Sequence, residues 1–168
     1  MYYEGEGITR DTKQAVYWWQ KAAEQGNAGA QHNLGLMYNK GDGVTRDAKQ
    51  AAYWYQKAAE QGDAKAQTTL GAMYAAGKGV SRDEKQALYW TQKAAEQGYA
   101  SAQFFLGLMF AYGKGVVQDF VRAHMWFNLS ADSSDEVLAN EKRMTLKQIT
   151  RAKKMARDCQ QRNYRNCG

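Results

Sequence analysis

Two histidines and two cysteines are the side chains of this 168-residue chain best suited to acid–base, metal or redox chemistry. A catalytic histidine needs a nucleophile within hydrogen-bond reach, and a two-histidine metal site needs both imidazoles to converge with a carboxylate. No nucleophile is spaced to meet His32, and His124 lies far from it along the chain. We therefore expect no catalytic residue, no metal site and no cofactor, with His32 solvated or touching a ligand and His124 partly packed.

The two cysteines, Cys159 and Cys167, stand close together near the end of the chain. A bridge between them would close a loop of about eight residues and stabilise the tail by roughly 2.5 kcal/mol. Two free thiols are the alternative, and an intact bridge would persist only outside a reducing cytosol. We expect the bridge, because a lone pair of cysteines near a terminus, without metal partners, has few other uses.

The net charge of +6 is concentrated in the tail. Residues 142–168 carry nine basic side chains and one acidic one, whereas the preceding 141 residues have a net charge of −2. Such a run can bind nucleic acid or an anionic surface, but it is more often a solvated face, and Tyr164 is the one aromatic residue within it. Binding of nucleic acid or an anionic surface is therefore an alternative that the sequence does not favour. No run of about 18 apolar residues is present, so we expect no transmembrane segment.

The elements that must position these residues come from an internal repeat. The hexapeptide at 21–26 returns letter for letter at 57–62 and at 93–98, a step of 36 residues. Recurrence at this length is typical of solenoids, whose repeats bury their apolar faces only by stacking on one another. The chain contains no proline, so helices can run uninterrupted, and glycine is the residue expected at their ends and turns.

Each repeat predicts a helical hairpin. Asp47, followed three residues later by Gln50, gives the capping-box pattern at a helix start. Gly41 and Gly43 precede that cap and indicate a tight connection, and Gly62 would end the helix in the left-handed conformation. The same cap recurs at Asp11, at Asp83 and at Asp119, where Arg122 replaces the glutamine.

The other helix of each repeat starts near residues 28, 64 and 100, and one of its faces is nearly identical between copies. Glutamine, leucine, glycine and an aromatic residue cluster on that face, so it must be the packed one. The opposite arc differs between copies, so stacking does not fix its side chains, and we expect it to line a trough that binds a partner. Its polar end is His32, Asn33, Leu36, Asn39 and Lys40, its small-residue floor is Thr68, Thr69 and Ala72, and its apolar end is Phe104, Phe105, Leu108 and Tyr112.

The repeat register is lost after Ala131, as expected of a terminal cap. Capping boxes at Ser133 and Thr145 predict two further helices near 134–143 and 146–160. Burial of Phe104 and Phe105 under these helices is the alternative to a role in binding. The predicted domains are a solenoid over residues 1–133, in units of about 1–26, 27–62, 63–98 and 99–133 with the first unit truncated, and a helical cap with a basic tail over residues 134–168.

The repeat unit reads Ala-x-Ala-Gln-x-x-Leu-Gly-x-Met-Tyr-x-x-Gly-x-Gly-Val-x-x-Asp-x-x-Gln-Ala-x-x-Trp-x-x-Lys-Ala-Ala-Glu-x-Gly over roughly residues 1–131. This pattern resembles the Sel-one-like repeat family, whose α/α solenoids are related to tetratricopeptide repeats but have a longer, glycine-marked turn. The tail also resembles bacterial members, at 126–127 and at 144–145, while the fourth unit departs from the pattern at 128–131. The resemblance implies an all-α, right-handed superhelical solenoid with C-terminal capping helices.

The resemblance implies a non-enzymatic scaffold that binds a protein or peptide on its concave face. Members are described as adaptors, as host-interaction factors and as partners that neutralise secreted toxins. Together with the expected disulfide, this indicates a periplasmic or secreted bacterial protein, which we expect to be a monomer. Some relatives are linked to β-lactamase activity, which would need a Ser-x-x-Lys nucleophile, and no serine of this chain is followed by lysine at that spacing. We therefore do not expect an enzyme.

Overall fold

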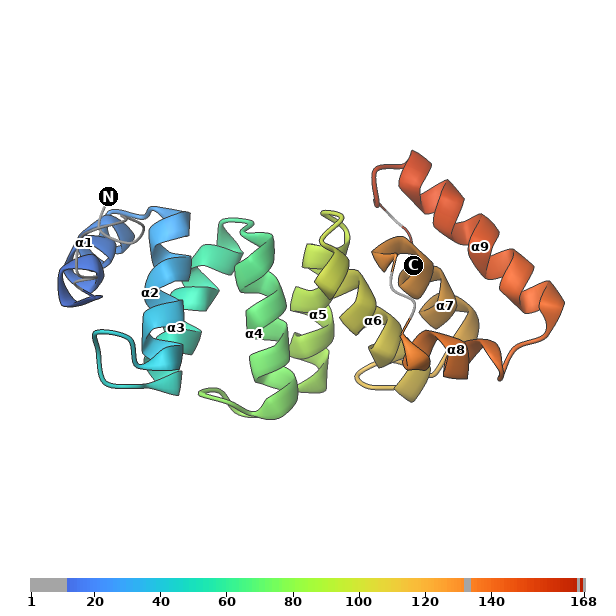
Figure 1. The fold of residues 1–168 in the computed structure, drawn as a ribbon, viewed down its shortest axis with the longest axis horizontal. Helices are drawn as coiled ribbons and strands as arrows, with labels where there is room; N and C mark the ends of the chain where they lie inside the picture. Colours follow the sequence, from blue (N-terminus) through green and yellow to red (C-terminus); the bar gives the residue numbers. More distant parts are fainter. Residues whose placement is uncertain (1–11, 132–133, 166, 168) are drawn as a thin grey trace. The chain divides into compact units, whose positions relative to one another are not determined.

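The computed structural model describes residues 12–131, 134–165 and 167, and all regular secondary structure in these residues is helical (Figure 1). The chain forms two compact units, Met1–Arg82 and Asp83–Gly168, and each is described by itself. The helices pair in hairpins that follow the 36-residue repeat. The prediction of an all-α solenoid of helical hairpins is therefore confirmed.

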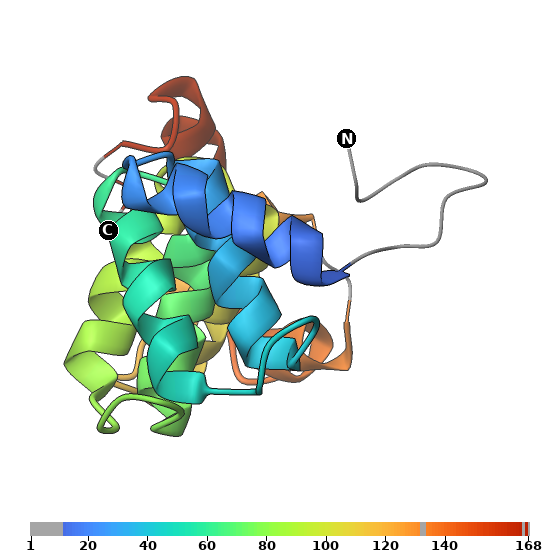
Figure 2. The ribbon, with the colours of Figure 1, turned by 90° about the vertical axis from the view of Figure 1, so that its left-hand side faces the viewer.

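The first unit contains four described helices, α1 (Thr12–Glu24), α2 (Ala28–Lys40), α3 (Ala48–Glu60) and α4 (Ala64–Ala76). Each helix contacts the next one along the chain, and Figure 2 shows α1, α2 and α3 side by side. The connections after α1 and α3 are short turns, whereas the one after α2 is the longer, glycine-marked loop. The longer loop joins the two helices of one repeat, so α2 and α3 form a hairpin, and the short turns join one repeat to the next.

The second unit contains five described helices, α5 (Glu84–Ala95), α6 (Ala100–Tyr112), α7 (Phe120–Ser130), α8 (Asp135–Glu141) and α9 (Leu146–Gln161). Helix α6 packs between α5 and α7, and both α8 and α9 pack on α7. The two helices predicted after the repeats are thus present as the cap of the fourth repeat.

The aspartate N-caps follow the prediction, but the reciprocal glutamine bond of the predicted capping box is replaced at Asp47, whose backbone N–H donates to the Tyr38 carbonyl at 2.9 Å. The Asp47 carboxylate accepts hydrogen bonds from the backbone N–H groups of Lys49 and Gln50, at 2.8 and 3.1 Å. Asp83 and Asp119 cap α5 and α7 in the same way. Both bonds of a capping box are present at Thr145.

Two predicted helix starts need separate mention. Asp11 and Ser133 lie outside the described residues. The N-cap of α8 is Ser134, which makes no side-chain capping bond, so the start of this short helix is shifted from the predicted capping box.

A buried glutamine joins each repeat to the one before it. The side-chain N–H of Gln31 donates to the carbonyl of Ala23, in the last turn of α1, at 3.0 Å. That carbonyl also accepts the backbone N–H of Gly26 at 3.0 Å, so the bond uses its second lone pair, and the group that it saves from being buried unpaired is the side-chain N–H of Gln31. The equivalent bonds are Gln67 to Ala59 at 3.0 Å and Gln103 to Ala95 at 3.2 Å.

Helix glycines allow the two helices of a hairpin to approach closely. A Cβ added at Gly35 would lie 3.0 Å from the ring of Tyr55, and one added at Gly107 would lie 2.5 Å from the ring of Phe127. The aromatic ring of the second helix therefore lies directly on the backbone of the first. The second glycine of each glycine-marked loop is equally constrained, because a Cβ at Gly79 would collide with the Ala48 carbonyl of the preceding repeat.

The glycine contact predicts that Gly107→Ala destabilises the second unit. The added methyl overlaps the Phe127 ring, and overpacking of this kind lowers the free energy of unfolding by about 1–3 kcal/mol. The matched control is Gly29→Ala in α2, an exposed position where the methyl would meet only the Asn27 side chain at 3.4 Å. There we expect stabilisation of about 0.5–1 kcal/mol, because alanine is the better helix former. Urea denaturation of both variants checks this, and equal shifts in the same direction would contradict it.

Candidate partner-binding surface

The predicted arc residues lie on α2, α4 and α6, opposite the buried face of each helix. Gln31, Leu34 and Gly35 are buried, as are the matching residues of α4 and α6. None of the twelve predicted residues is buried. Those most exposed are Lys40, Ala72 and Tyr112, and the half-buried ones are His32, Asn33, Leu36, Asn39, Thr68, Thr69, Phe104, Phe105 and Leu108.

His32 is more engaged in the fold than a solvated residue would be. Its Nδ1 lies 3.4 Å from a carboxylate oxygen of Asp63, and its ring meets the Tyr55 ring edge to face at 5.6 Å. Asp63 also caps α4 through the Ala66 N–H. Burial lowers the pKa of His32, and the attraction of Asp63 offsets part of that effect. The imidazole thus lies at the contact between two successive repeats and keeps 18% of its side chain exposed.

The remaining polar groups of the first unit are largely paired. Lys78, in the loop after α4, donates to the side-chain oxygen of Asn39 at 2.7 Å and so links two repeats. The hydroxyls of Thr68 and Thr69 donate back to carbonyls of their own helix, at 2.8 and 2.9 Å. The floor of this arc therefore offers a partner few unpaired hydroxyl groups.

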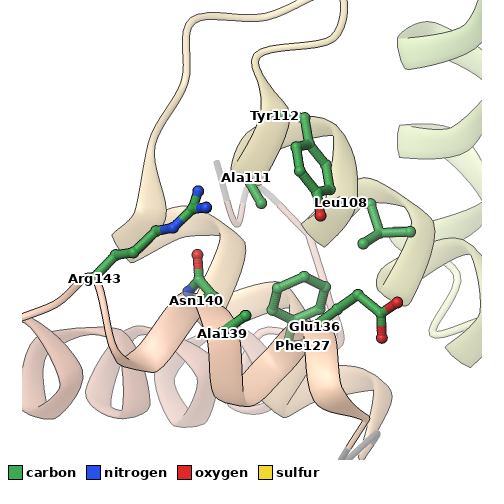
Figure 3. Close-up of a pocket in the computed structure, with 8 residues that line it drawn as sticks. All are labelled: Leu108, Ala111, Tyr112, Phe127, Glu136, Ala139, Asn140 and Arg143. Carbon is green, nitrogen blue, oxygen red and sulfur yellow. The ribbon is translucent and has the colours of Figure 1, made fainter.

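The arc of the second unit is apolar and meets the cap. Phe104 packs against Phe127 with ring centroids 5.5 Å apart, yet it keeps part of its surface exposed. The cap helices do not bury Phe104 and Phe105 completely, so both remain available for contact. Leu108 and Tyr112 line a small pocket between α6, α7 and α8 (Figure 3).

The other residues of this pocket were not predicted from the sequence. Its volume is about 20 Å³, enough for one ordered water molecule. Helix α8 lies outside the repeat, so no comparison between copies could single out its side chains. The pocket is completed by Ala111 and Phe127, by Glu136, Ala139 and Asn140 of α8, and by Arg143 just after it (Figure 3).

A larger cavity of about 290 Å³ lies elsewhere in the second unit, between α5, α6 and α7. Leu88, Leu106 and Phe110 form apolar walls, and Arg122 and Trp126 also line it. None of the twelve predicted arc residues lines this cavity, so it belongs to a different surface.

The second helices carry exposed aromatic residues that the sequence analysis also missed. Tyr53 is exposed, its ring meets Trp54 edge to face, and the ammonium of Lys57 lies 5.7 Å from its centroid. The sequence could have revealed these residues, because the set of tyrosine, tryptophan and lysine recurs at the spacing of the repeats. The other copies are Tyr17, Trp18 and Lys21 in α1 and Tyr89, Trp90 and Lys93 in α5.

His124 is fully buried rather than partly packed. Its side chain is 1% exposed, and its Nε2 lies 3.2 Å from a carboxylate oxygen of Glu141 at the end of α8. Burial lowers the pKa of His124, while Glu141 acts in the opposite direction and Lys153 adds to the lowering. Among the described residues, no group of three histidine, cysteine or acidic side chains could hold a metal ion.

The C-terminal tail is fastened to the second unit. A disulfide joins Cys159, at the end of α9, to Cys167. The turn that the bridge closes places Tyr164 against Gly98, where an added Cβ would lie 2.9 Å from the tyrosine ring. Helix α9 buries Ala152, Ala156 and Cys159, and its basic residues are exposed. In the described part of the chain, no helix has the length and apolar composition needed to cross a bilayer.

The helical hairpins and their exposed arcs define the class of protein as an α/α solenoid with unburied, copy-specific helix faces. The Sel1 repeat matches residues 1–27, 28–63, 64–99 and 100–135, and the chain therefore belongs to the Sel1 repeat family. This confirms the resemblance found in the sequence. Among curated proteins the sequence has no significant match.

Solved structures of bacterial proteins share this fold. The chain is 37% identical to c5321, a protective antigen of uropathogenic Escherichia coli with an SLR fold, with a TM-score of 0.86 over 99% of this chain and 37% of that one. It is 37% identical to a Sel1 repeat protein from Oxalobacter formigenes, with a TM-score of 0.73 over 94% of this chain and 59% of that one. Cysteine rich protein B of Helicobacter pylori, at 23% identity and a TM-score of 0.59 over 80% of this chain and 98% of that one, shows the fold alone. The chain thus spans less than two thirds of the first two proteins.

Acid is predicted to destabilise the second unit through His124. Because the folded state lowers the pKa of this buried imidazole, its stabilising effect is present above the unfolded-state pKa of about 6.5 and is lost as the pH falls below it. Urea midpoints measured from pH 7.5 to 5.5 should therefore fall for the wild type and fall less for His124→Gln. Parallel curves would contradict this assignment.

The disulfide predicts a redox-dependent stability. Opening the loop between Cys159 and Cys167, which are 8 positions apart, should lower the free energy of unfolding by about 2.5 kcal/mol. Thermal unfolding with and without dithiothreitol measures this for the wild type. The control is the double variant Cys159→Ser/Cys167→Ser, which should match the reduced wild type and not respond to reductant. A wild type that is indifferent to reductant would contradict the prediction.

Proposed function

We propose that the chain is a non-enzymatic scaffold that binds a protein or peptide partner through the outward arcs of α2, α4 and α6. One observation carries the proposal: all twelve arc residues keep exposed surface, while the residues that hold the helices together are buried. Stacking therefore leaves the arc side chains free, and their variation between copies supports selection for contact with something else.

The character of the arcs suits a partner of mixed composition. In the first unit, α2 presents an amide at Asn33 and an ammonium at Lys40. In the second unit, α6 presents the rings of Phe104, Phe105 and Tyr112. Exposed aromatic anchors are frequent energetic hot spots of protein interfaces. We infer that the arc of α6 supplies most of the binding energy and that the arc of α2 supplies orientation.

The contacts of the two histidines support a scaffold rather than an enzyme. His32 is paired with Asp63, a residue that is itself occupied in capping α4. His124 is buried beside Glu141 under the cap. Both imidazoles thus serve contacts within the fold, where a general base would need an open face toward substrate.

The disulfide and the relatives support a location outside the cytosol. A bridge such as Cys159–Cys167 persists in oxidising compartments, and one of the similar structures is a protective antigen. We propose a periplasmic or secreted bacterial protein that acts in host interaction or neutralises a secreted toxin. A monomer would leave the arcs open for the partner.

Site-specific photo-crosslinking tests the proposed surface. We expect p-benzoylphenylalanine at Leu36 or at Leu108 to capture the same protein from an extract of the native organism, because both positions are half-exposed on the arcs. The matched control is the same residue at Gln56, which is exposed on α3, a second helix outside the arcs. Capture at Gln56 with none at Leu36 and Leu108 would place the interface on the other surface and overturn the proposal.

A further inference from the structure

The basic run of the tail is arranged on one face of α9. This helix packs on α7 and buries Ala152, Ala156 and Cys159 (Figure 1). At about 100° per residue, its five cations fall on the opposite side, within less than half of the helix circumference. All five side chains are exposed: Lys147, Arg151, Lys153, Lys154 and Arg157. The charge run is therefore a continuous cationic face of α9.

The cations of this face are not balanced by acidic side chains. None of them forms an ion pair with a described residue, and α9 has one acid, the half-buried Asp158. In α1, α3 and α5, by contrast, the last lysine is followed three residues later by glutamate, as Lys57 is by Glu60. Like charges four positions apart weaken a helix, and Lys147 and Arg151 are such a pair. The face is therefore unfavourable in the free protein, and an anionic partner would relieve it.

Two features of the tail favour a lipid bilayer over other anionic partners. Leu146 is 80% exposed at the start of α9 and lies within the same arc as the cations, and an apolar side chain beside cations suits the boundary between headgroups and acyl chains. Tyr164, the one aromatic residue of the tail, lies against Gly98, so its ring is not free to stack on the bases of a single-stranded nucleic acid. The convex face of a helix about 24 Å long also suits a flat surface.

We propose that the cationic face of α9 binds the headgroups of an anionic phospholipid bilayer. The helix lies along the bilayer surface, its lysine and arginine side chains meet the lipid phosphates, and Leu146 enters the boundary below them. The turn that the disulfide closes adds two exposed cations, Arg162 and Arg165, at the end of the helix. The inference goes beyond the proposed scaffold function, because α9 packs on α7 and the arc that is proposed to bind a protein belongs to α6.

Co-sedimentation of the intact protein with lipid vesicles tests this inference. The probes are vesicles of phosphatidylcholine alone and vesicles of phosphatidylcholine mixed with phosphatidylglycerol. The protein should bind the mixed vesicles and not the neutral ones, and raising the salt concentration to about 1 M, where the Debye length is about 3 Å, should release it. Equal binding to both kinds of vesicle, or binding to neither, would overturn the inference.

A pair of double variants assigns the effect to α9. Arg151→Gln/Lys154→Gln should weaken binding to the mixed vesicles about 25-fold, because each cation near an anionic surface contributes about fivefold in affinity. The matched control, Lys49→Gln/Lys57→Gln, removes the same charge from exposed positions of α3 and should leave the affinity nearly unchanged. Equal weakening by both variants would show attraction to net charge alone and overturn the assignment.

The urea midpoint separates loss of binding from loss of fold. Because the α9 variant removes like charges from exposed positions, its midpoint should not fall below that of the wild type.

Two anionic polymers distinguish a bilayer from other partners of the same charge. A short DNA duplex and poly-glutamate offer negative charge without an apolar interior. At equal concentrations of negative charge, the mixed vesicles should bind more tightly than either polymer, and Leu146→Ser should weaken binding to the vesicles only. Equal or tighter binding of DNA or of poly-glutamate would overturn the bilayer as the partner of α9. None of these probes contains the protein partner, so their failure would leave the scaffold proposal to its own crosslinking test.

Discussion

The buried glutamine of each first helix provides the contact on which the stacking of repeats depends. Its side-chain N–H donates to a last-turn carbonyl of the preceding helix, as Gln31 does to Ala23. The carbonyl also accepts the N–H of Gly26, but the glutamine is buried, and leaving its side-chain N–H unpaired would cost about 1–3 kcal/mol. Because the bond forms at one relative position of the two helices, it fixes how each hairpin follows the last. Alanines around it, such as Ala23 and Ala30, are small enough to let the helices approach.

This constraint also decides which side chains remain for function. Gln31, Leu34 and Gly35 occupy the packed face of α2, and Gly35 must stay small because Tyr55 lies on its backbone. The helix is too narrow to bury its opposite face against the same neighbours, so Asn33 and Leu36 keep exposed surface. The architecture therefore separates positions that hold the fold from positions that can change without disturbing it. A scaffold that varies its ligand needs that separation.

The hairpins, their caps and the packed face could be predicted because the short sequence patterns that specify them recur in successive repeats. Asp47 and Gly41, for example, act within one turn of the chain, so spacing alone reveals them. The pairing of His32 with Asp63 could not be predicted, since it joins a helix to the start of the next repeat. The pocket around Asn140 was missed for the same reason: it forms between a repeat and a helix outside the repeat. The bridge between Cys159 and Cys167 was expected from their isolation near the terminus, with free thiols as the alternative, because spacing contains no information on where the tail turns.

The fourth repeat shows how the end of the solenoid creates a surface that the repeats lack. In α3 the exposed face carries Lys49, Tyr53 and Lys57, whereas the same positions in α7 are Val121, Met125 and Leu129. Met125 and Leu129 are buried, and α8 and α9 both pack on α7. The face of α7 that would be solvated in a repeat is apolar, so the cap helices pack on it. This places the polar side chains of α8 beside the arc of α6. Repetition generates arcs of one general kind, and its interruption places the side chains of α8 beside the last of these arcs.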